Sequence, residues 1–207
     1  MKINRLLLGS LCFILTLLAA CTVVPIDEEG NLIGVGEVFD AETLVDEIWE
    51  AQVIPAFQRN AVPIEQILSM LEKDPQAARE KFGRQAAVGG PFTFMAKGEG
   101  KVIELETSLL QIDLPPYDGI SEVAIKIGPV FTGTEVRDAL DFIQFKDFRD
   151  VTQFFAVANE LNKKVRSEVV VVIDKNGIVG KTIAFHGAFG LKEKTEVVII
   201  PVILEIK

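Results

Sequence analysis

Apolar positions recur at helical spacing in two segments of the first half of the chain. Asp40 is a suitable N-cap, and an apolar stripe follows it at positions 44, 45, 48 and 49. We expect this helix to stop or kink at Pro55, because proline lacks the N–H that a helix interior needs. A second helix is predicted from Pro63 to about Asp74, where apolar residues again share one face. Both helices are amphipathic, so each needs a surface to cover.

From residue 89 onward the pattern becomes that of β-strands, interrupted by one helix. We expect Gly98-Glu99-Gly100 and Asn176-Gly177 to form hairpin turns. The helix is predicted at 147–164, with Phe148, Val151, Phe155, Ala158 and Leu161 on its apolar side. The predicted strands are 92–97, 101–113, 122–127, 130–145, 168–174, 180–185 and 196–206.

This order of elements predicts an α+β fold. Strands followed by a helix and further strands are typical of an oligonucleotide/oligosaccharide-binding (OB) barrel, a Greek-key fold with an internal helix. The last strand is apolar at nearly every position from Val197 to Leu204, so both of its faces need burial. One face can point into the barrel, and the N-terminal helices can cover the other. An open α+β sheet is the alternative.

The N-terminus has the layout of a secretion signal. Lys2 and Arg5 precede a mostly apolar run that is too short to span a bilayer, and small residues lead to Cys21. Leu18-Ala19-Ala20-Cys21 resembles the lipobox of bacterial lipoproteins, in which the cysteine thiol carries lipid. The alternative is an ordinary signal peptide with an incidental Cys21. We therefore expect lipidation of Cys21, a palmitate-type anchor in the cell membrane and a position outside the cytoplasm.

These features divide the chain into four parts. They are a signal peptide at 1–20, a tether at 21–38, a helical cover at 39–88 and an OB-like barrel at 89–207, with 39–207 forming one compact domain. Cleavage removes Cys12 and leaves Cys21 as the only cysteine, so no disulfide is expected.

The charge of the chain excludes one class of partner. Its net charge is −9, and loss of Lys2 and Arg5 with the signal makes it −11. Binding to nucleic acid depends on lysine and arginine side chains that neutralise phosphates. The acidic balance therefore predicts no nucleic-acid partner.

Few residues indicate catalysis or metal binding. His186 is the only histidine, so a multi-histidine metal site is excluded. Strand alternation places it towards solvent or a strand-end loop, where a neutral or structural role is favoured over a catalytic one. Asp138, Asp141 and Glu135 are the first candidates for acid/base chemistry, although acids at this spacing are common on solvated faces. We expect no metal and no cofactor.

Residues 128–140 concentrate unusual chemistry in an apolar region. Thr132, Thr134, Arg137 and Asp138 lie there among glycines and a proline. One interpretation is a buried Arg137–Asp138 ion pair that clamps a strand to a turn. The other is a small polar pocket at the mouth of the barrel.

Four stretches carry a resemblance to a known family. They are GPVFTGTEVRDALDFIQFKDF at 128–148, ANELN at 158–162, GAFGL at 187–191 and PVILEI at 201–206. Together they resemble an uncharacterised family of predicted periplasmic lipoproteins, a domain of unknown function, over residues 49–204. Thr132 stands where the family usually has arginine. The resemblance implies a gene neighbourhood with sugar-type ABC transporters.

Two functions remain open. The preferred hypothesis is a non-enzymatic lipoprotein that serves an ABC-type importer of sugars or nucleosides, by docking on it or by binding a small carbohydrate or nucleoside. The alternative is an envelope hydrolase that uses carboxylates.

Overall fold

The computed structural model describes residues 39–87, 89–191 and 197–207. The predicted signal, Cys21 and the tether lie outside these residues. The helices are α2 (Ala41–Ile48), the π-helix η2 (Trp49–Val53), α3 (Ile54–Asn60), α4 (Ile64–Lys73), α5 (Pro75–Phe82), α6 (Glu135–Ala139), the 3-10 helix η3 (Phe145–Asp147), α7 (Val151–Lys164) and the π-helix η4 (Val165–Val170). The strands are β1 (Val62–Pro63), β2 (Gly83–Gln85), β3 (Phe92–Leu105), β4 (Leu109–Asp113), β5 (Val123–Lys126), β6 (Thr182–Gly190) and β7 (Val197–Ile206). No helix within the described ranges is both long and apolar enough to cross a bilayer.

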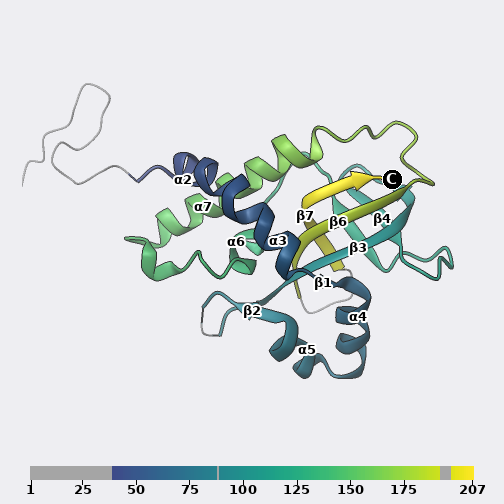
Figure 1. The fold of residues 1–207 in the computed structure, drawn as a ribbon, viewed down its shortest axis with the longest axis horizontal. Helices are drawn as coiled ribbons and strands as arrows, with labels where there is room; N and C mark the ends of the chain where they lie inside the picture. The colour runs from purple at the N-terminus through teal and green to yellow at the C-terminus, as the bar shows by residue number, and fades with distance from the viewer. Residues whose placement is uncertain (1–38, 88, 192–196) are drawn as a thin grey trace, which may run out of the picture. The chain divides into compact units, whose positions relative to one another are not determined.

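Five strands close into a ring in which each strand pairs with two others of the ring, and β1 and β2 pair with β3 outside it (Figure 1). Going round the ring, the order is β3, β4, β5, β7, β6 and back to β3, and only the β5–β7 pair is parallel. The long β3–β6 pairing, from Thr93↔Gly190 to Lys101↔Thr182, closes the ring. Three strands, a helical segment and two strands therefore follow one another in the order of an OB barrel, and the alternative of an open sheet is wrong. The predicted strands 92–97 and 101–113 have different bounds in the structure, because β3 joins the first to the start of the second and β4 is formed by its end.

Strand β3 corrects one predicted turn. Gly98-Glu99-Gly100 is not a hairpin turn, because β3 runs through it without interruption. A Cβ on Gly98 would lie 2.8 Å from Ile64 Cγ2, and one on Gly100 would lie 2.9 Å from the Asp113 carbonyl oxygen. The two glycines therefore allow close packing against β3, a requirement that sequence cannot distinguish from a turn.

Two other predicted strands are helical. The segment 130–145 contains α6, because Val136, Ala139 and Leu140 bury one face at helical spacing. The first three residues of the predicted strand 168–174 are the last three residues of η4, and η4 packs against β7. Its valines favour a strand by propensity, but tertiary packing overrides that preference. Asn176-Gly177 consequently lies in a connection to β6 and does not join two strands.

The first helix does not stop at Pro55, one of the two predicted outcomes, because α3 follows η2 directly. The π-helix η2 precedes this proline, and the Ile54 N–H bonds to the Trp49 carbonyl. A π-turn widens the helix, and such bulges allow irregularities within an otherwise continuous helix. Pro55 then occupies the first turn of α3, a position where proline is well tolerated. Trp49 is buried, with 1% of its surface exposed.

The helices cover the ring on two sides. α3 contacts β3, β6 and β7, and α2 packs on α7 (Figure 1). α4 and α5 contact β3, so the predicted cover on the C-terminal strand is formed only by the first helical segment. Helix α7 buries Phe154, Val157, Ala158 and Leu161 and leaves Val151 and Phe155 exposed. Its predicted apolar face was therefore correct only at Ala158 and Leu161.

Candidate functional site

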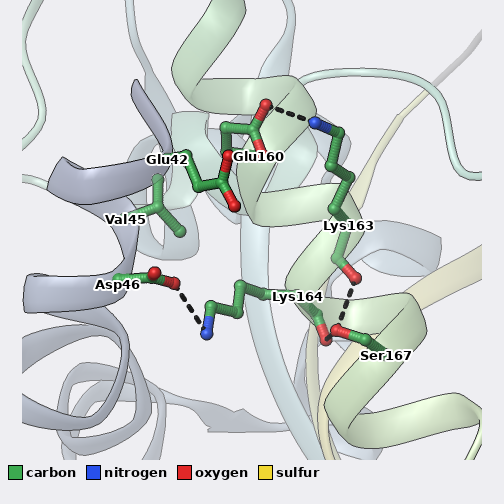
Figure 2. A pocket seen from close by; sticks show the side chains of 7 residues that line it. All are labelled: Glu42, Val45, Asp46, Glu160, Lys163, Lys164 and Ser167. Atoms are coloured by element: carbon green, nitrogen blue, oxygen red, sulfur yellow. Dashed lines mark hydrogen bonds and ion pairs between the residues drawn. The ribbon is translucent and has the colours of Figure 1, made fainter. Parts of the chain in front are cut away.

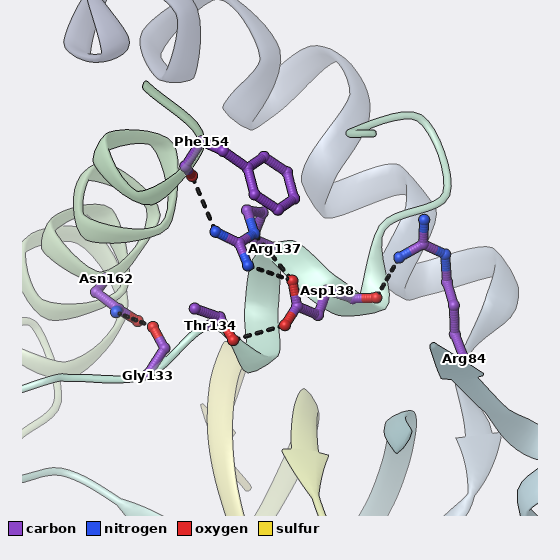
Figure 3. A network of polar contacts seen from close by, with 7 residues as sticks. All are labelled: Arg84, Gly133, Thr134, Arg137, Asp138, Phe154 and Asn162. Atoms are coloured by element: carbon purple, nitrogen blue, oxygen red, sulfur yellow. Dashed lines mark hydrogen bonds and ion pairs between the residues drawn. The ribbon is translucent and has the colours of Figure 1, made fainter. Parts of the chain in front are cut away.

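Arg137 lies in the interior on the short helix α6. It is 4% exposed, and Asp138 beside it is 6% exposed. The guanidinium donates from Nε to Asp138 Oδ1 at 2.9 Å and from Nη2 to the same oxygen at 2.6 Å. Its Nη1 donates to the Phe154 carbonyl on α7 at 2.9 Å (Figure 3). The arginine thus joins two helices that are separated in the sequence.

The remaining atoms of Asp138 are also engaged. The Thr134 hydroxyl donates to Oδ2 at 2.6 Å, and the Arg84 guanidinium on β2 donates to the Asp138 carbonyl (Figure 3). A buried ion pair is tolerated when such hydrogen bonds satisfy its remaining donors and acceptors. The network therefore ties α6 to α7 and β2, whereas the sequence suggested a clamp between a strand and a turn.

The loop before α6 is held from α7. Asn162 donates from Nδ2 to the Gly133 carbonyl at 3.0 Å, and Gly133 has the positive φ of 106° that favours glycine. Thr132, the fourth predicted residue of this site, is exposed and lies outside this network. Arg84 and Asn162 were not predicted, because their partners are distant in the sequence.

Aromatic rings surround the buried arginine. The Arg137 guanidinium lies 3.6 Å from the centre of the Phe154 ring and 5.5 Å from that of Phe155. Phe145 and Phe148 pack against Phe154, with ring centres 5.6 and 5.4 Å away. Phe145, Val151 and Phe155 are each about half exposed, and we call these three residues the aromatic patch. The polar network therefore supports an apolar surface at the start of α7.

The candidate acid/base residues are in different surroundings. Asp138 is buried and accepts hydrogen bonds on both carboxylate oxygens, and Glu135 is half-buried. Asp141 is exposed and lines a pocket of about 160 Å³ together with Arg84, Thr93 and Asn60. Asp141 thus opens onto a pocket with further polar groups, whereas Asp138 is enclosed by its hydrogen-bond partners.

His186 lies in the middle of β6 rather than at a strand end. It pairs in register with Lys97 on β3 and Ile203 on β7. Its Nδ1 is buried and has no hydrogen-bond partner. Burial lowers the pKa of the imidazole below its usual 6.5, and the positive charge of Lys97 lowers it further. The ring is therefore biased towards its neutral form.

A second polar pocket lies between α2 and α7 (Figure 2). Lys164 forms ion pairs with Asp46 at 2.8 Å and Glu168 at 2.6 Å. The hydrogen bonds that Lys164 Nζ donates to these two carboxylates raise the pKa of Lys164 to about 12. The lysine is thus charged at neutral pH and links the two helices, so it has the character of a structural contact.

Three carboxylates outside these sites lie close together. Asp113, Asp118 and Glu122 form a group that could hold a metal ion, at the connection between β4 and β5. None of the three was predicted from the sequence, because acids are frequent in this chain and their meeting depends on how the loop turns.

The fold has a solved counterpart. The crystal structure of an OB-fold protein from Thermotoga maritima matches with a TM-score of 0.69 and 22% sequence identity, over 83% of this chain and 100% of that chain. Together with the strand order, this match shows an OB-like fold, with the N-terminal helices added to it. No curated protein matches the sequence.

The family assignment comes from the sequence. The family model described as predicted periplasmic lipoprotein (DUF2291) matches residues 11–205, which include Cys21. This match confirms the extracytoplasmic, lipid-anchored localisation that the N-terminus indicated. The chain belongs to the predicted periplasmic lipoprotein family DUF2291.

Proposed function

We propose that this lipoprotein is a non-enzymatic accessory component of an ABC-type importer of sugars or nucleosides, and that it docks on the importer through the aromatic patch. The anchor keeps the folded unit at a membrane surface, where membrane-bound transport proteins are accessible. The resemblance of the sequence to its family implies a gene neighbourhood with sugar-type ABC transporters. The exposed aromatic patch is the structural observation that supports docking.

The aromatic patch has the character of an interaction surface. Phe145, Val151 and Phe155 are 49%, 53% and 51% exposed. Val151 and Phe155 are four residues apart on α7 and therefore neighbours on the helix surface. Aromatic residues are enriched at protein interfaces, where they bury a large area at small entropic cost. The Arg137 network holds the supporting helices in place, so little ordering is needed on binding.

The alternative of a carboxylate hydrolase receives less support. General acid/base catalysis needs a carboxyl group that can reach substrate and exchange a proton. Asp138 is buried and accepts hydrogen bonds from Arg137 and Thr134, so it is not available in this arrangement. Asp141 would then have to act without Asp138 as its partner.

A co-purification experiment tests the proposal. Full-length lipoprotein is isolated from solubilised membranes in gentle detergent, and the importer subunits in the eluate are quantified. Val151→Asp should strongly reduce their recovery, because a charge in the aromatic patch must be desolvated on docking. Val179→Asp is the matched control, since Val179 is 52% exposed but belongs to the connection before β6.

Two results would contradict the proposal. One is the absence of importer subunits from the wild-type eluate in repeated preparations. The other is equal recovery with Val151→Asp and wild-type protein, which would exclude the aromatic patch as the docking surface. Both variants should show wild-type circular dichroism and thermal midpoints, because both side chains are exposed.

A further inference from the structure

We propose that the connection between β4 and β5 binds a Ca²⁺ ion through the carboxylates of Asp113, Asp118 and Glu122. One carboxylate oxygen from each of these residues lies within 4.8 Å of the others. Asp113 is the last residue of β4, and the other two precede β5. Negative charges this close repel one another, and a cation between them converts the repulsion to attraction.

Asp113 provides an independent indication of a ligand. Its side chain is buried, with 2% of the residue exposed. The Gly119 N–H donates to Oδ2 at 2.9 Å, but the buried Oδ1 has no hydrogen-bond partner. A buried carboxylate oxygen without a partner costs free energy, so such atoms are rare in folded proteins. A cation bound at Oδ1 would remove this cost.

The other two carboxylates are oriented in the same manner. The Ile120 N–H donates to Asp118 Oδ1 at 2.9 Å, and the Leu114 N–H donates to Glu122 Oε2 at 2.8 Å. In each carboxylate a backbone N–H therefore holds one of the two oxygens, which restricts how the carboxylate can turn. None of the ion pairs formed by the described residues involves these three acids.

The donor set selects the ion. All three side chains offer oxygen, which suits hard cations such as Ca²⁺ and Mg²⁺ rather than Zn²⁺ or Cu²⁺. Mg²⁺ requires near-ideal octahedral geometry, whereas Ca²⁺ accepts irregular sets of six to eight oxygens. A loop whose carboxylates are partly held by backbone N–H groups fits the more permissive ion. Extracellular modules bind Ca²⁺ with dissociation constants on the order of 10⁻⁴ to 10⁻³ M, which we expect here.

Binding would stabilise an exposed part of the loop. Tyr117 and Ile120 lie between the ligands and are 48% and 65% exposed. The backbone turns through positive φ at Tyr117 (64°) and Gly119 (85°). An ion held by residues on both sides of this turn would fix the position of the two exposed side chains.

Calorimetric titration measures binding directly. Full-length lipoprotein in detergent is freed of metal with EDTA, dialysed, and titrated with CaCl₂ or with MgCl₂. We expect saturable binding of one Ca²⁺ per chain. Asp118→Asn should weaken it about tenfold or more, because one charged ligand is lost. Asp174→Asn is the matched control, since Asp174 Oδ1 likewise accepts from an N–H two residues ahead, that of Asn176, but lies outside the cluster.

Terbium luminescence locates the site. Tb³⁺ replaces Ca²⁺ at oxygen sites and emits when a nearby excited aromatic ring transfers energy to it. Tyr117 is the only tyrosine of the chain and lies within the loop. Excitation of tyrosine should give Tb³⁺ emission that excess Ca²⁺ removes. Tyr117→Phe should lose most of this emission and keep the calorimetric Ca²⁺ binding.

Three results would overturn the assignment. The first is no saturable heat with millimolar Ca²⁺ on wild-type protein that circular dichroism shows to be folded. The second is equal affinity in Asp118→Asn and the Asp174→Asn control, which would place any bound ion elsewhere. The third is tighter binding of Mg²⁺ than of Ca²⁺, which would refute the choice of ion.

Discussion

The guanidinium of Arg137 lies in the interior of the protein, and the groups that contact it compensate for the loss of water around its positive charge. One carboxylate, one backbone carbonyl and one aromatic face contact the guanidinium. The carboxylate of Asp138 in turn accepts a hydrogen bond from the Thr134 hydroxyl, so neither charge is left without partners. The ion pair thus depends on residues from α6 and α7, and removing either member would strand the other.

Replacing Arg137 should be severely destabilising. Arg137→Met keeps the length of the side chain but leaves Asp138 as a buried carboxylate without its counter-ion, which should cost about 3–5 kcal/mol. Urea denaturation followed by circular dichroism measures the free energy of unfolding. Arg149→Met is the control, because the Arg149–Asp150 pair is exposed and should change stability by less than about 1 kcal/mol. An Arg137→Met variant with the same free energy of unfolding as the wild-type protein would refute the role of Arg137 as a clamp.

The imidazole of His186 should make stability depend on pH. Its folded pKa is lowered by burial and by Lys97, so the unfolded chain binds the proton more tightly than the folded one. The free energy of unfolding is then fully retained above the usual pKa of 6.5 and falls as the pH drops through the folded value.

His186→Gln tests this dependence, because glutamine does not titrate. Urea denaturation from about pH 8 to about pH 5 should show wild-type protein losing stability relative to the variant below about pH 6.5. Identical pH profiles would mean that His186 is solvated normally in the folded state.

Among the elements, β3 shows how a strand accommodates close packing on both sides. It pairs with β4 and β6 and meets α4 near Gly98. Gly98 lies opposite Phe185 and Gly100 opposite Ile183 in the β6 register. Absence of side chains at these two positions lets the large apolar residues of neighbouring elements approach the backbone.

Adding one methyl group to β3 should therefore be costly. Gly98→Ala would place a Cβ 2.7 Å from Phe185 Cζ and 2.8 Å from Ile64 Cγ2. We expect a loss of about 1–3 kcal/mol in the free energy of unfolding, as found for overpacked cores. Gly190→Ala is the control, because its nearest contact would be an ordinary 3.6 Å and it has no positive φ. Equal thermal midpoints for the two variants would contradict this account.

For the whole molecule, family membership places the folded unit outside the cytoplasm at the end of a lipid anchor. The unit from Asp40 to Lys207 is compact, and its described strands form the ring. Its chain is acidic, with a net charge of −9 before processing. Retention at the membrane therefore has to come from the lipid rather than from attraction to anionic headgroups.

Loss of Cys21 should release the protein from the membrane. Cys21→Ser removes the thiol that we predict to carry lipid, so labelling of cells with radioactive palmitate should give no labelled band for the variant. The variant should remain as an uncleaved or soluble precursor on cell fractionation. Persistent label on Cys21→Ser would show that lipid is attached elsewhere.

The sequence alone determined features that depend on neighbouring residues. The lipobox-like segment at Cys21 is a local motif, and Asp40, the predicted N-cap, caps α2 by accepting a hydrogen bond from the Glu42 N–H only two residues away. The nearly uninterrupted apolar run of β7 required burial on both faces wherever it lay. These features, with the order of strands and helix, were sufficient to predict an OB-like fold and the cellular location.

Only the tertiary structure decided what depends on distant partners. Gly98 and Gly100 belong to a continuous strand because β6 pairs along it through both positions, and neighbouring residues such as Ile64 and Ile112 pack closely against them. The valines of η4 are helical because they pack on β7, against their local preference. Asp113, Asp118 and Glu122 meet because backbone N–H groups of the loop orient each carboxylate. These features depend on packing and hydrogen bonding between residues that are far apart in the sequence or in a folded loop. The pattern of residues along the chain does not show which of them will come into contact.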